Sequence, residues 1–142
     1  MSISRARRAH DPSPGDRRRA RERALDLLYE AEVKDETPSE VLQSLPAEPD
    51  PFADELVRGV EQDLETIDAL IAKHAEGWAV DRMPAVDRQL MRIATYELLA
   101  RKDVSRAVII DEAVDLAKDF STAESGAYVN GVLSAIADEI GR

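Results

Sequence analysis

The 142-residue chain has no cysteine, which excludes a disulfide scaffold, a thiolate zinc site and a cysteine nucleophile. Its two histidines are isolated and no H-E-x-x-H motif occurs, so we do not expect a zinc enzyme. Aromatic residues make up only 4% of the chain, and β-branched residues are sparse outside Val108-Ile109-Ile110, which argues against a β-sandwich or barrel.

Long apolar runs are also missing. No segment reaches the roughly 18 apolar residues of a membrane span, and no apolar region follows the basic start as it would in a secretory signal. We therefore expect no membrane partner and a cytoplasmic location. No glycine-rich phosphate loop is present either, and the sequence calls for no cofactor.

Charge is distributed unevenly along the chain. Residues 1–23 hold eight arginines against three acidic residues, a net charge of +5. The remainder holds 11 basic against 26 acidic residues, a net charge of −15, and the whole chain carries −10. A basic tip on an acidic body predicts two partners of opposite sign, a polyanion for the tip and a basic protein for the body.

Apolar residues recur at three- and four-residue steps through most of the chain, which predicts an all-α protein of six to seven helices. We expect a disordered basic tail over residues 1–16 and a single helical domain over 17–142. The region of Pro84 divides this domain into an N-terminal bundle of about 17–80 and a C-terminal bundle of about 81–142. The expected helices are one that starts near Pro14–Asp16 and runs to about Val33, a short one near 39–45, one long or two kinked helices over 52–74, and three more ending near 98, 120 and 140.

Three local patterns bear on where these helices run. Val108-Ile109-Ile110 alone could form a strand, but the helical period continues through it. Ser121-x-x-Glu124 fits a capping box for the last helix. Asn130-Gly131 is typical of a turn, yet the apolar stripe runs across it, so we interpret Gly131 as a close-packing point between helices, with a loop as the alternative.

The basic start of the first helix is the sharpest functional feature. At 100° per residue, Arg18, Glu22, Leu25 and Tyr29 fall on one flank, with Arg21 beside them. Guanidinium groups bind phosphates, and a tyrosine ring can stack on an unpaired base, so this flank favours RNA binding. The alternative is a solvated arginine-rich helix end with Tyr29 as a core residue at its boundary.

No group of residues favours an enzyme. Asp111, Asp115 and Asp119 lie on one helix face and could be imagined as a carboxylate site, but a solvated acidic face is the better interpretation. His10 and His74 have no second ligand at helical spacing, so no metal site is expected.

Three segments, in order and spacing, resemble the NusB family of bacterial transcription antitermination factors. These are Arg17–Glu22 followed by Ala24–Tyr29, then Asp87–Leu99, and finally Ile110–Lys118 followed by Tyr128–Leu133. The likeness covers residues 17–142, and Asp81–Arg88 looks most like actinobacterial members.

The resemblance implies a fold of two perpendicular three-helix bundles and no catalysis. It implies a transcription antitermination factor that binds the boxA RNA of ribosomal RNA leaders, together with the small-ribosomal-subunit protein that acts as NusE. It further implies that the protein associates with the RNA polymerase elongation complex and other Nus factors and supports ribosomal RNA transcription.

The resemblance also assigns residues to the two partners. Its RNA-facing motif matches Arg17, Arg18, Arg19, Arg21 and Tyr29. Ala75 stands where an aromatic RNA contact occurs in some members, and His74 beside it is the substitute. The positions that face the ribosomal protein match Asp87, Glu124 and Tyr128, with Glu124 replacing an aspartate.

Two other functions stay open at this point. NusB-like helical domains precede the catalytic domain of some ribosomal RNA cytosine methyltransferases, so the chain could be the RNA-binding part of such an enzyme. A structural homodimer that hides the arginine patch is the other alternative, and the sequence does not distinguish a monomer from a homodimer.

Overall fold

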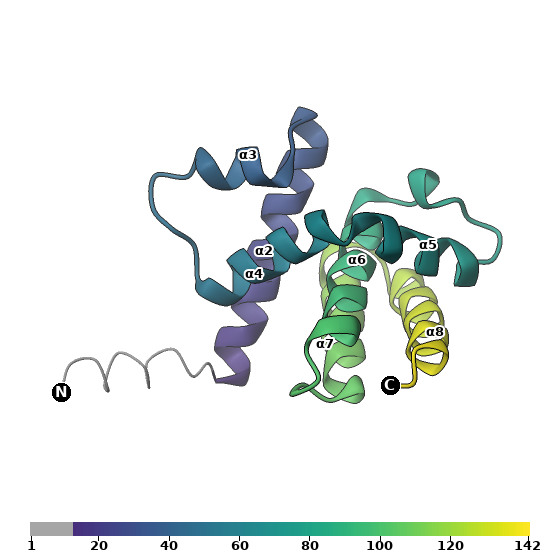
Figure 1. Ribbon diagram of the computed structural model, residues 1–142. Coiled ribbons are helices and arrows are strands. Elements are labelled where there is room, and N and C mark those ends of the chain that lie inside the picture. Colours follow the sequence, from purple (N-terminus) through teal and green to yellow (C-terminus); the bar gives the residue numbers. More distant parts are fainter. Residues whose placement is uncertain (1–12) are drawn as a thin grey trace.

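The computed structural model describes residues 13–142, and this part of the chain forms seven α-helices, one 3-10 helix and no strand (Figure 1). The predicted all-α class is thus confirmed. Most of the predicted tail lies outside the described residues, but residues 14–16 belong to the first helix. The elements are α2 (Pro14–Lys34), α3 (Pro38–Gln43), α4 (Pro51–Gln62), α5 (Leu64–His74), η1 (Val80–Arg82), α6 (Ala85–Ala100), α7 (Arg106–Phe120) and α8 (Ala123–Glu139).

Side-chain caps explain where several helices begin. At the start of α2, the Ser13 hydroxyl accepts a hydrogen bond from the Asp16 backbone N–H at 3.2 Å, and the Asp16 carboxylate accepts one from the Ser13 N–H. The start of α8 differs from the predicted box at Ser121, because the cap is Thr122, whose Oγ1 accepts from the Ser125 N–H at 3.0 Å. Ser121 instead ends α7, with its N–H bonded to the Ala117 carbonyl at 2.8 Å.

The stretch over 52–74 forms two helices, the second of the two arrangements that its pattern allows. The break lies at Asp63, which ends α4 and precedes α5. It lets the chain change neighbours, because α4 packs against α2 and α6, whereas α5 packs mainly against α6 and α8. In Figure 1, α5 therefore lies on the opposite side of α6 from α2, although the sequence groups it with the N-terminal half.

Gly131 and Gly59 both lie inside helices, but only one of them is at a close contact between helices. Gly131 lies inside α8, so the loop alternative is wrong, but it is exposed and nothing lies within 4 Å of the place a Cβ would take. The predicted close packing there is therefore also wrong. The close approach is at Gly59 instead, where a Cβ would lie 2.1 Å from Cε1 of Tyr96, so only glycine lets α4 approach the Tyr96 ring on α6.

The core is one continuous apolar cluster, with α6 at its centre in contact with α2, α4, α5, α7 and α8. Buried or half-buried ion pairs also link the helices. Arg88 of α6 donates from Nε to Glu32 of α2 at 3.1 Å, and Gln89 donates to the same carboxylate at 2.8 Å. Across residues 13–142, no helix is both long enough and apolar enough for a membrane crossing.

Candidate nucleic-acid interface

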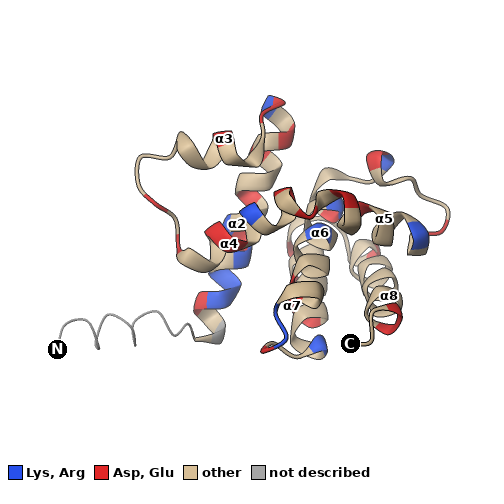
Figure 2. Cartoon of the chain, in the orientation of Figure 1, with Lys and Arg blue, Asp and Glu red and all other residues tan. Residues whose placement is uncertain are grey.

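Helix α2 carries the basic run, and its buried stripe decides which arginines reach solvent. Ala20, Ala24, Leu27, Leu28 and Ala31 are buried against the neighbouring helices. The arginines occupy the turns before and between these positions, and their exposure differs from one to the next. Figure 2 shows basic residues gathered along the lower half of this helix, beside acidic residues of neighbouring elements.

Arg19 and Arg23 are the most accessible guanidinium groups of the run. The Arg19 side chain is 72% exposed and pairs only with Asp16, three residues earlier on the same helix. Arg23 is also exposed, and no carboxylate within residues 13–142 lies within ion-pair distance of it. The family motif as matched from sequence leaves Arg23 out, although its four-residue spacing from Arg19 places both on one face.

Arg17 and Arg18 are both partly buried. Nε of Arg17 is shielded from solvent without a hydrogen-bond partner among the described residues. The Arg18 side chain is 28% exposed and lies among carboxylates of α7, the nearest being Oδ2 of Asp119 at 2.7 Å. Both arginines thus border the exposed face of α2 but do not extend freely from it.

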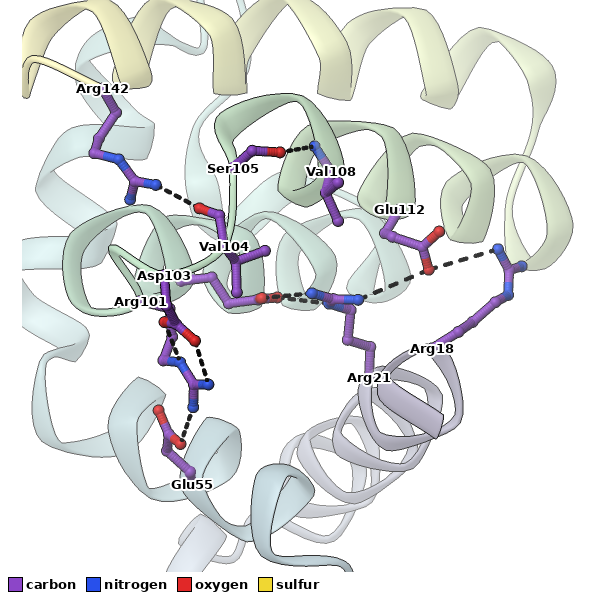
Figure 3. A network of polar contacts seen from close by, with 11 residues as sticks. Arg18, Arg21, Glu55, Arg101, Asp103, Val104, Ser105, Val108, Glu112 and Arg142 are labelled. Atoms are coloured by element: carbon purple, nitrogen blue, oxygen red, sulfur yellow. Dashed lines mark hydrogen bonds and ion pairs between the residues drawn. The ribbon is translucent and has the colours of Figure 1, made fainter. Parts of the chain in front are cut away.

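Arg21, which the sequence predicts to face RNA, is only 3% exposed in the structure. Its Nε and Nη2 donate to the two carboxylate oxygens of Glu97 on α6, at 2.9 and 2.8 Å, as drawn in Figure 3. The guanidinium also lies 5.5 Å from the centre of the Phe52 ring. The i+4 and i+7 positions, Leu25 and Leu28, are buried, and this spacing could have shown that Arg21 lies on the core side.

Tyr29 is 44% exposed, and the neighbouring Val33 is 65% exposed. Nearly half of the Tyr29 side chain is therefore accessible to a ligand. Its ring lies on the flank of α2 that also holds Arg18 and the partly exposed Glu22. An exposed aromatic ring in line with a guanidinium group is an arrangement suited to stacking on an unpaired base.

The structure does not bring His74 to this flank. Figure 1 places the end of α5 well away from α2, and Nε2 of His74 lies 2.6 Å from Oε1 of Glu139 on α8. The hydrogen bonds from His74 and Lys73 lower the pKa of the Glu139 carboxyl below its usual value. Ala75 is buried. His74 thus joins α5 to α8, and its predicted RNA contact has no support in this geometry.

Asp87, which the resemblance assigns to the protein partner, is also buried in the structure. Asp87 is 0% exposed, and its Oδ2 accepts a hydrogen bond from the Ser125 hydroxyl at 2.7 Å. Its other oxygen, Oδ1, is buried and has no partner among the described residues. Asp87 therefore joins the first turn of α6 to the first turn of α8 inside the protein.

The other two residues predicted to meet the ribosomal protein do reach the surface. Glu124 is exposed, and Tyr128 one turn later is half-buried. The Tyr128 ring meets Trp78 edge-on, with centroids 5.4 Å apart, and Trp78 is 41% exposed. Burial and the nearby charge of Asp87 raise the pKa of Tyr128. Sequence reasoning missed Trp78, whose place at the surface comes from the 75–79 connection.

Comparison with known proteins identifies the family of this chain. The NusB family model matches residues 18–138. The transcription antitermination protein NusB of Salinispora arenicola is 49% identical over 129 residues, which cover 86% of this chain and 95% of that protein.

Two solved structures share the fold. NusB of T. maritima superposes with a TM-score of 0.78 at 37% identity, covering 87% of this chain and 91% of that one. A crystal structure of antitermination factors NusB and NusE in complex with double-stranded RNA matches with a TM-score of 0.75 at 31% identity, covering 87% and 96%. The resemblance found in three sequence segments is therefore confirmed over most of the chain, and this protein belongs to the NusB family.

Proposed function

We propose that this protein is a transcription antitermination factor that acts by binding, without catalysis, and that it holds boxA RNA of ribosomal RNA leaders together with the ribosomal protein NusE. The observation that carries the RNA contact is the solvent-exposed surface of α2, where Arg19 and Arg23 reach solvent on one face and Tyr29 on the neighbouring flank. Family membership and the similar NusB–NusE complex with double-stranded RNA support the choice of partners.

The protein partner is assigned to the surface around Glu124, Tyr128 and Trp78, at the start of α8. The exposed Trp78 ring and the half-buried Tyr128 ring offer apolar contact area, and the exposed carboxylate of Glu124 suits a basic partner. Sedimentation of the protein alone and with each partner separates this function from a structural homodimer, which would self-associate without RNA and lose its arginine surface on doing so.

The RNA contact is tested by replacing both exposed arginines. Arg19→Ala with Arg23→Ala should weaken binding to single-stranded boxA RNA and flatten the dependence of log affinity on log salt by about 1.4, because two phosphate contacts are lost. Binding is measured by fluorescence anisotropy over a series of salt concentrations. A matched control is Arg58→Ala with Arg82→Ala, which removes two exposed arginines from α4 and η1. Equal losses in both variants would mean that only net charge matters and would overturn the α2 assignment.

The stacking contact is tested at Tyr29. Tyr29→Ala should weaken RNA binding by about 1–3 kcal/mol, as loss of one base stack does. Tyr29→Phe keeps the ring and should bind almost as the parent does. Because the side chain is 44% exposed, the melting temperature should change little in either variant. Normal RNA binding by Tyr29→Ala would show that the ring does not contact a base.

A further inference from the structure

Arg18 lies within ion-pair distance of four carboxylates, whereas Arg21, in the same basic run, lies within that distance of two. Its Nη2 lies 2.7 Å from Asp119, and its Nη1 lies 3.8 Å from Asp115 and 4.0 Å from Glu112, all on α7. Its Nε is 3.7 Å from Glu22 on its own helix. Figure 3 shows the side chain reaching from α2 toward Glu112, which it shares with Arg21.

The exposure of this cluster sets it apart from the structural ion pairs of the protein. The side chains of Asp115 and Asp119 are 57% and 59% exposed, whereas Arg21 and Glu97 are 3% and 1% exposed. Exposed ion pairs contribute little to stability, since water and salt screen them. The contacts of Arg18 with Asp115 and Asp119 can therefore be exchanged at low cost, but the Arg21–Glu97 pair cannot.

We propose that Asp115 and Asp119 compete with RNA phosphates for the Arg18 guanidinium and thereby limit the affinity of the α2 flank for RNA. This inference rests on the RNA binding proposed above. Carboxylates and phosphates accept the same paired N–H donors, so a phosphate at Arg18 displaces the hydrogen bond to Asp119. The released carboxylates then lie beside a phosphate of like charge, which opposes binding further.

The test uses three single variants on the same helix. Asp119→Asn and Asp115→Asn should each tighten binding of single-stranded boxA RNA by about threefold to tenfold, within the range of coupling measured between neighbouring charges. The matched control is Asp111→Asn, which removes an exposed charge one turn earlier that is not within ion-pair distance of Arg18. It should change the affinity by less than about twofold, because distant exposed charges are largely screened.

A double-mutant cycle with Arg18→Ala makes the test specific. Without the guanidinium, Asp119→Asn should tighten RNA binding no more than Asp111→Asn does. With the guanidinium present, Asp119→Asn should steepen the slope of log affinity against log salt by about 0.7, the value for one further phosphate contact on a single strand. Equal gains from all three aspartate variants, or a gain that persists beside Arg18→Ala, would overturn the competition.

Failure of the competition and failure of RNA binding give different results. If the parent protein does not bind the RNA, and Arg19→Ala with Arg23→Ala has no effect, the proposed function itself fails. If the parent binds and loses affinity on those two changes but the cycle shows no coupling, only the role of Asp115 and Asp119 is wrong. A thermal melt of each variant identifies any change that acts through folding.

Discussion

Glu97→Ala is expected to lower the free energy of unfolding by about 3–5 kcal/mol, as removal of one partner from a buried ion pair does. The reason is that Arg21 would keep its charge while it is 3% exposed and has lost both hydrogen bonds to the carboxylate. Glu112, at 3.8 Å from Nη1, is too distant to replace them. Urea denaturation followed by circular dichroism measures the loss.

Two further variants separate the stability role from an RNA contact. Arg21→Met with Glu97→Leu removes both charges and should regain most of the lost stability, because no unpaired buried charge remains. If it folds, it should bind boxA RNA with nearly the affinity of the parent, since Arg21 does not reach solvent. A folded double variant with parental stability and strongly weakened RNA binding would restore Arg21 to the RNA interface.

Asp87→Lys is expected to prevent stable folding, because it places a cation at a position that is 0% exposed. The hydrogen-bond partner of Asp87 is the Ser125 hydroxyl, which is not a carboxylate and cannot neutralise the lysine. An unpaired buried charge costs several kcal/mol, which is a large share of the 5–15 kcal/mol that stabilises a typical domain. The Ser125 hydroxyl would also lose its acceptor at 2.7 Å. Thermal and urea melts measure the effect.

Glu124→Lys makes the same change of charge at an exposed position on α8 and is the matched control. Its free energy of unfolding should stay within about 0.5 kcal/mol of the parent value. Its binding to the basic ribosomal protein should weaken several-fold, since like charges then meet across the interface. If Asp87→Lys instead folded normally and lost only partner binding, Asp87 would face the partner as its sequence position predicts.

Local sequence was sufficient for the helices themselves. Apolar spacing predicted the all-α class, and the residues that start and end helices placed α2 within a residue or two of its observed bounds. Where local patterns allowed two outcomes, neighbours decided between them. The chain breaks at Asp63 because α4 and α5 pack on different helices, and Ser121 ends α7 rather than capping α8.

By itself, then, the sequence determined the helical class, the charged run at the start of α2 and the likeness to NusB proteins. It did not determine which charged residues face solvent. Arg21 is buried by Glu97, 76 residues away, and Asp87 is bonded to Ser125, 38 residues away. A helical wheel gives the direction of a side chain around its own helix, but whether another helix covers that direction depends on packing between distant segments. For this reason Arg23 and Trp78 emerge as surface residues, and Arg21 and Asp87 as interior ones, only in the tertiary structure.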